Sequence, residues 1–256
     1  MKTLENATSA LSIISESIEP VSVAEIGKRL GLPRSSASRL MASLRNGNLV
    51  EQDPQTRLYG PGLLAWQLGA RYQPSGYDSD LLAEALISLS QATGFTCWMA
   101  VLDRTDVVLL RQHLGRTPAQ FSVRLGQTLP AHATAVGKAL LSRLPDAAIE
   151  QLFDETLAKE TPQTFDRRTQ LIEDIRTVRD RGYALSRQEV FPGVMAVGGS
   201  LYGTISNFPV GLSLSFPTHL GNAEDVAKLL TDELRRVGCE LGDSFWSHRP
   251  SGPSGV

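Results

Sequence analysis

Apolar residues recur every three or four positions through the first part of the chain, which is the spacing of amphipathic helices. The run from Ala10 to Ile18 predicts a first short helix that ends before Pro20, because proline cannot donate an amide to the preceding turn. Ser22 and Glu25 have the spacing of a capping box and predict the start of a second helix. This helix is expected to end at Gly31, a residue that favours helix C-termini.

A third helix is predicted to begin at Pro33, where the missing amide of proline does no harm. The apolar residues of its inner face, at helical spacing, are Ala37, Leu40, Met41 and Leu44. A tight turn separates this helix from the second one. Two helices joined in this way are typical of a helix-turn-helix motif, whose second helix enters the major groove of DNA.

The residues after the third helix predict a β-hairpin. Leu49–Gln52 and Arg57–Tyr59 flank Asp53–Thr56, in which aspartate and proline favour a turn. A hairpin behind a helix-turn-helix makes the winged version of the motif. The wing would place the cation of Arg57 against the DNA backbone or the minor groove.

Charge is unevenly distributed along the chain. The formal net charge is -2, which excludes a uniformly basic nucleic-acid coat, yet the segment from Ile26 to Val50 carries only basic charges. Such a run is often only a solvated face. Here the basic segment coincides with the predicted DNA-binding helices. Small hydroxyl side chains let a DNA backbone come close, and guanidinium groups bind phosphate or guanine. The residues predicted to contact bases are Arg34, Ser35, Ser36, Ser38 and Arg39, and those predicted to bind phosphates are Lys28, Arg45 and Arg57.

The rest of the chain alternates between helical and strand-like patterns, which predicts an α+β domain with a largely antiparallel sheet, one face of which is covered by helices. The predicted helices are Gly62–Arg71, Ser79–Thr93, Ala133–Leu144, Ala147–Leu152, Thr169–Arg181 and Ala223–Val237. The predicted strands are Phe95–Leu102, Val107–Gln112, Gln120–Leu125, Tyr183–Leu185, Met195–Leu201 and Val210–Phe216. The helix at Gly62–Arg71 has two interpretations on periodicity alone, a linker or a core helix of the first domain.

Composition narrows the class of protein. A chain of 256 residues with 41% hydrophobic and 20% charged residues is expected to form one large or two small globular domains. No apolar run approaches the roughly 18 residues that a membrane span needs, so no membrane contact is expected. Cys97 and Cys239 are too few for a disulfide framework, which favours a reducing cytoplasm.

Two stretches carry a family resemblance. Ser22 to Gly62, with Gly31–Ser36 and Tyr59–Leu63, resembles the winged helix-turn-helix of IclR-type bacterial transcriptional regulators. Gly126–Leu141, supported by Arg181–Ala184, resembles the effector-binding domain of that family, which has a GAF-like fold. The resemblance implies a DNA-binding domain at residues 1–61, a linker helix at 62–76, an effector-binding domain at 77–246 and a tail at 247–256.

The function that the resemblance implies is ligand-responsive control of a catabolic operon. The expected partners are double-stranded operator DNA, a small carboxylate effector and a second copy of the chain, in a dimer or a dimer of dimers. No cofactor and no metal ion are expected. The linker helix, Leu63 to Arg71, is the expected transmitter between effector and DNA.

The effector residues implied by the resemblance are Phe121, Leu129, Ala135, Val136, Ser186, Val194, Ala196, Ser213 and Ser215. The last two alternate along a strand and therefore share one sheet face, although that face could also be an ordinary solvated one. The turn at His132 and the helix after it are expected to offer unpaired amides to a carboxylate. Ser186 and Ala196 replace more polar residues that are frequent in the family, which favours an acid with an aromatic or otherwise apolar body.

Catalytic motifs fail on spacing. A phosphate loop ending at Gly137-Lys138 would need glycine where His132 stands, and a nucleophile elbow around Ser213 would need glycine at position 215. The four histidines lack metal-site spacing, and Cys97 in an apolar strand is expected to be a buried apolar residue. Two alternatives stay open: a metabolic enzyme that uses the second domain on a small acid, with an accessory DNA-binding domain, and an architectural DNA-binding protein without an effector.

Overall fold

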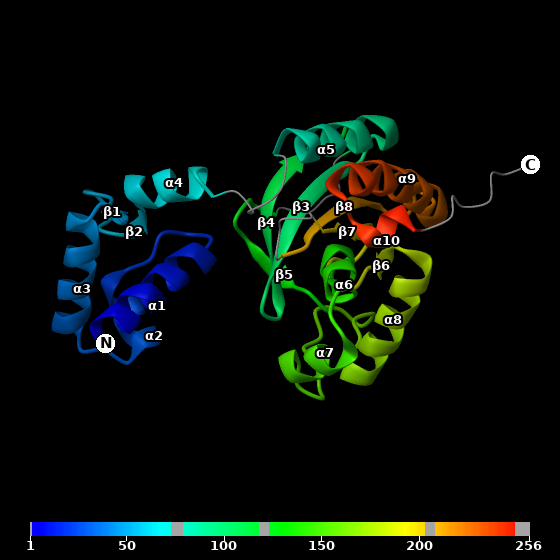
Figure 1. The fold of residues 1–256 in the computed structure, drawn as a ribbon. Coiled ribbons are helices and arrows are strands. Elements are labelled where there is room, and N and C mark those ends of the chain that lie inside the picture. Colours follow the sequence, from blue (N-terminus) through cyan, green and yellow to red (C-terminus); the bar gives the residue numbers. More distant parts are fainter. Residues whose placement is uncertain (1, 73–78, 118–122, 203–207, 249–256) are drawn as a thin grey trace, which may run out of the picture. The chain divides into compact units, whose positions relative to one another are not determined.

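The computed structural model describes residues 2–72, 79–117, 123–202 and 208–248. The chain divides into two compact units, Met1–Gln73 and Pro74–Val256, each with its own apolar core (Figure 1). In these described parts no helix is long and apolar enough to span a membrane.

The first unit contains the predicted three helices, α1 (Lys2–Glu16), α2 (Val23–Leu30) and α3 (Arg34–Asn46). Their shared core includes Ile14, Ile26 and Met41. Helix α1 begins earlier than predicted, because the residues before Ala10 face solvent or are only partly buried and leave no apolar period in the sequence. The helix-turn-helix itself is confirmed.

The turn between α2 and α3 depends on local backbone chemistry. The Ser22 hydroxyl accepts the Glu25 amide at 3.2 Å and caps α2. The Glu25 carboxylate pairs with Arg29 at 2.6 Å instead of returning to the cap, so the second half of the predicted capping box is replaced by a surface ion pair. Gly31 ends α2 with a φ of +62°, a left-handed conformation that a glycine adopts without strain.

The predicted wing is an antiparallel pair, β1 (Val50–Gln52) and β2 (Tyr59–Pro61). Strand β2 begins two residues later than predicted, because Arg57 has a φ of +61° and belongs to the turn. The wing is joined to the helices by a bridge between Val21 and Tyr59. Helix α4 (Leu63–Ala70) follows within the same unit.

The second unit is built on one six-stranded antiparallel sheet with the strand order β5-β4-β3-β8-β7-β6. The strands are β3 (Thr96–Asp103), β4 (Asp106–His113), β5 (Thr128–Pro130), β6 (Ala184–Arg187), β7 (Val194–Leu201) and β8 (Val210–Pro217). The helices are α5 (Ser79–Thr93), α6 (Ala135–Leu141), α7 (Asp146–Leu152), α8 (Arg168–Arg181), α9 (Ala223–Leu241) and α10 (Ser244–Ser247). The predicted mixed α and antiparallel β architecture is confirmed.

Helices cover both faces of this sheet, which corrects the prediction of one covered face (Figure 1). In β3, Cys97 and Met99 pack toward α5 and α9, while Trp98 and Ala100 pack toward α6 and α8. A strand that is buried on both sides loses the alternation of polar and apolar residues that would reveal a solvated face.

Two further predictions are corrected at the edges of the unit. No strand forms at Val123–Leu125, because the chain turns around Gly126, whose φ is +80°, and the edge strand is β5 instead; residues 120–122 lie outside the described part.

The last helices extend beyond Val237. Trp246, on α10, is 1% exposed and donates its indole N–H to Ser200 O at 2.9 Å, so the chain after α9 packs into the core.

Candidate functional site

Helix α3 presents most of its predicted DNA-contacting side chains to solvent. Its buried face consists of Ala37, Met41 and Leu44, which fixes the rotation of the helix. The side chains placed on the exposed side are Arg34, Ser35, Ser38, Arg39 and Arg45, while Ser36 is half-buried and lines a groove beside α1. This arrangement leaves hydroxyls and guanidinium groups together on one accessible helix face.

The wing and the end of α3 are joined by side-chain hydrogen bonds. Arg45 Nη1 donates to Gln52 Oε1 at 2.9 Å, and Gln52 Nε2 donates to Arg57 O at 3.0 Å. The Asp53 carboxylate accepts the Thr56 amide and the Thr56 hydroxyl, and these hydrogen bonds lower the pKa of Asp53. The turn that carries Arg57 therefore has a defined shape at neutral pH.

Lys28 and Arg57 are exposed, as binding to phosphate requires. The neighbouring Arg29 is engaged with Glu25. Each predicted DNA-contacting residue thus lies on the first unit, distributed over α2, α3 and the wing. Contact with DNA stays a prediction.

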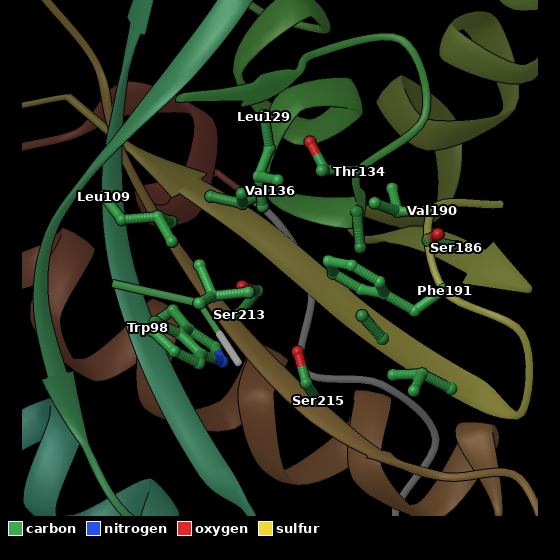
Figure 2. A pocket seen from close by; sticks show the side chains of 14 residues that line it. Trp98, Leu109, Leu129, Thr134, Val136, Ser186, Val190, Phe191, Ser213 and Ser215 are labelled. Carbon is green, nitrogen blue, oxygen red and sulfur yellow. The ribbon is translucent and has the colours of Figure 1, made fainter. Parts of the chain in front are cut away.

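A cavity opens in the second unit between the sheet and the start of α6 (Figure 2). Every predicted effector residue that the structure describes lines it. These residues are Leu129, Ala135, Val136, Ser186, Val194, Ala196, Ser213 and Ser215. Phe121 lies outside the described residues. The structure thus brings together side chains from β5, α6, β6, β7 and β8.

Strand register positions the serines of this cavity. Ser213 is opposite Gly198 and Ser215 is opposite Ala196, so both hydroxyls lie on the same face of the sheet. A Cβ at Gly198 would lie 2.5 Å from the backbone of Ala135. Only glycine allows α6 to approach the sheet this closely, and this approach forms one wall of the cavity.

The polar groups of the cavity are neutral. The Ser186 hydroxyl donates to Ala133 O at 2.8 Å, and Thr134 Oγ1 accepts the Gly137 amide at 3.1 Å. The Ala133 and Thr134 amides donate to Pro130 O, so these two turn amides serve the fold. Binding of a carboxylate by the first amides of α6, at Ala135 and Val136, stays a prediction. The hydroxyls of Ser213 and Ser215 are placed to donate to a ligand oxygen.

Sequence reasoning missed six other residues of the cavity wall: Trp98, Leu109, Val123, Thr134, Val190 and Phe191. The first three come from strands or turns with no distinguishing pattern. Thr134 carries the signal of a helix cap. The last two lie in the connection between β6 and β7, which has no helical or strand period.

Other chemistry-bearing residues have structural roles. His132 Nε2 is 2.8 Å from Ala158 O, and its ring contacts Phe153, which anchors the turn before α6. Cys97 is fully buried, and burial raises the pKa of its thiol far above the ordinary value, so it is a poor nucleophile. Among the described residues, no group of three or more His, Cys, Asp or Glu side chains is arranged to hold a metal ion.

Comparison with known proteins accounts for both units. The family model "Bacterial transcriptional regulator IclR C-terminal" matches residues 80–240, and the model "IclR helix-turn-helix domain" matches residues 3–54. The chain is 28% identical over 243 residues to the HTH-type transcriptional regulator XynR of Escherichia coli (strain K12), which covers 94% of this chain and 96% of that protein.

Solved structures share the fold. An IclR transcriptional regulator from Alicyclobacillus acidocaldarius gives a TM-score of 0.78 at 24% identity, over 96% of this chain and 99% of the other. An IclR homolog complexed with 4-hydroxybenzoate from Microbacterium hydrocarbonoxydans gives a TM-score of 0.78 at 17% identity, over 94% of this chain and 100% of the other.

Proposed function

Because the chain belongs to the IclR family of bacterial transcriptional regulators, we propose that it binds operator DNA of a catabolic operon and changes its affinity when a small organic acid binds. The helix-turn-helix unit supplies the DNA contact, and the cavity of the second unit supplies the effector site. Such a regulator acts in the bacterial cytoplasm, where the DNA is.

The DNA half of the proposal is supported by the exposed face of α3. Arg34, Ser35, Ser36, Ser38 and Arg39 enter the major groove, where guanidinium groups bind guanine and hydroxyls bind bases or phosphates. The phosphate contacts come from Lys28, Arg45 and Arg57. The Arg45–Gln52 hydrogen bond holds the wing against α3, so both elements meet DNA as one body.

The effector part of the proposal depends on one observation: all the described residues that the family resemblance implies line a single cavity. None of the described lining residues is charged, so a carboxylate would be held by serine hydroxyls and its body by apolar side chains. This lining favours an acid with an apolar body over a very small, highly polar one. The structural neighbour that holds 4-hydroxybenzoate is an example of such a ligand in the same fold.

Self-association completes the proposal. Helix α4 leaves Leu63, Trp66 and Leu68 between 59% and 69% exposed. Three large exposed apolar side chains on one short helix mark an interaction surface. A second copy of the chain covers this helix in a dimer, which would place two DNA-binding units on two half-sites of one operator.

Titration calorimetry on the full chain tests the effector site. Butyrate, whose body is apolar, is expected to bind more tightly than glyoxylate. The double variant S213A/S215A is expected to lose at least tenfold in affinity, because both hydroxyl donors are removed. Binding of glyoxylate alone, or unchanged affinity in the double variant, contradicts the assignment. Chemical turnover of any of these acids would favour the metabolic enzyme.

A further inference from the structure

The cavity contains an aromatic side chain that neither the sequence pattern nor the resemblance singled out. Phe191 enters it from the connection between β6 and β7, with its ring directed toward the interior (Figure 2). The cavity beside it has a volume of about 50 Å³. An engineered cavity that accommodates benzene has a volume of about 150 Å³. Phe191 in this position therefore limits the space that is left for the body of an acid.

The connection that carries Phe191 is closed by its own hydrogen bonds. Gln188 N donates to Val194 O at 2.9 Å, and Gly193 N donates to the Gln188 side chain at 2.8 Å. Val194 N donates to Phe191 O at 3.2 Å. These bonds fix the backbone at both ends of the connection and at Phe191 itself.

A buried ion pair fixes the same connection to the opposite wall. Lys138 Nζ lies 3.0 and 2.8 Å from the two carboxylate oxygens of Glu189, with side chains that are 1% and 7% exposed. The Glu189 backbone carbonyl accepts the Thr164 hydroxyl at 2.6 Å. Lys138 belongs to α6, whose first residues Ala135 and Val136 line the cavity.

The ion pair therefore ties the wall formed by α6 to the segment immediately before Val190 and Phe191. A buried pair that is hydrogen-bonded in this way is costly to separate, because either charge alone would remain desolvated. Phe191 consequently behaves as a fixed part of the wall, and the width of the cavity is set by the fold.

We propose that Phe191, held in place by the Lys138–Glu189 pair, sets the largest acid that the cavity accepts. This inference rests on the proposed effector function of the cavity. The proposed ligand of this chain is an acid with a compact aliphatic body. The Phe191 side chain alone excludes acids with an aromatic body. Removing the Phe191 ring enlarges the cavity that Ser215 and Ala196 also line.

The test uses the full-length protein and calorimetry with butyrate and benzoate as probes. Wild type is expected to bind butyrate more tightly than benzoate. The F191A variant is expected to gain at least tenfold in benzoate affinity while its butyrate affinity stays level or falls. The matched control is L129A, which also shortens a lining side chain but leaves Phe191 in place, and it is expected to gain less than threefold for benzoate.

Each other outcome overturns the proposal. Benzoate affinity that is equal in wild type and F191A shows that Phe191 does not limit size. An equal gain in L129A shows that any enlargement suffices. If neither acid binds any variant while specific DNA binding persists, the effector assignment of the cavity fails as well. A variant that does not fold is replaced by F191L, for which a gain of about threefold or more in benzoate affinity is expected.

Discussion

Single side chains of the helix-turn-helix unit are predicted to make two kinds of contact with DNA. Arg39 lies on the exposed side of α3, whereas Arg57 lies in the wing turn. R39A is expected to cost about 1–3 kcal/mol in discrimination between cognate and random DNA. R57A is expected to weaken binding to both about equally and to reduce the slope of log affinity against log salt by about one. Fluorescence anisotropy at several salt concentrations measures both effects. Equal losses on the two DNAs for both variants would contradict this division.

A second residue-scale prediction concerns the buried ammonium of Lys138. K138M removes the ammonium that pairs with both Glu189 and Asp174. The Glu189 carboxylate then stays buried without its charge partner, whereas the partly buried Asp174 keeps a longer pair with Arg181 at 3.8 Å. The expected loss in the free energy of unfolding is about 3–5 kcal/mol, measured by urea denaturation. The control is K159M, whose pair with Asp166 is about half exposed and contributes at most about 1 kcal/mol. Similar losses in both variants would refute the structural role given to Lys138.

At the scale of elements, α4 provides a direct test of self-association. None of its side chains is buried within the chain. W66E places a charge among the exposed apolar side chains of α4 and is expected to raise the dimer dissociation constant at least tenfold while the fold is retained. Sedimentation equilibrium measures the former and circular dichroism the latter. An intact dimer in W66E would show that α4 is not the interface.

The elements also show how far the sequence alone was informative. Helices with one apolar face and one solvated face, such as α3 and α5, were predicted from periodicity to within one residue at each end. Strand β5 was missed because three residues are too few to show alternation, and the turn at Gly126 interrupts the pattern. The first turns of α1 were missed because their side chains are exposed or only partly buried.

For the cavity of the second unit, the sequence pattern predicted only part of the wall. The alternation of Ser213 and Ser215 correctly placed both residues on one face. The sequence could not show that this face is enclosed, since the enclosing helix α6 is brought near by Gly198, far along the chain. Phe191 could not be predicted for the same reason: it lies two residues after Glu189, which pairs with Lys138, 51 residues away in the sequence.

For the whole molecule, the proposed effector cavity and the predicted DNA-contacting residues lie in different units, Pro74–Val256 and Met1–Gln73. An acid bound in one unit alters DNA affinity only if it favours one of two arrangements of the paired DNA-binding units. The coupling expected for such a system is about 1–3 kcal/mol, or roughly a 5- to 150-fold change in affinity. Helix α4 and the segment after it join the two units covalently. We therefore propose that they transmit the effect of acid binding from the second unit to the DNA-binding unit.

The most direct test of the account is the effect of an acid on operator binding. A labelled fragment from upstream of the protein's own gene is titrated with full-length protein, against random DNA, with and without butyrate. The account predicts specific binding that weakens with salt and shifts at least fivefold with the acid. The S213A/S215A variant should bind the fragment normally and lose that shift. Absence of specific binding, or a shift that is unchanged in the double variant, would contradict the account.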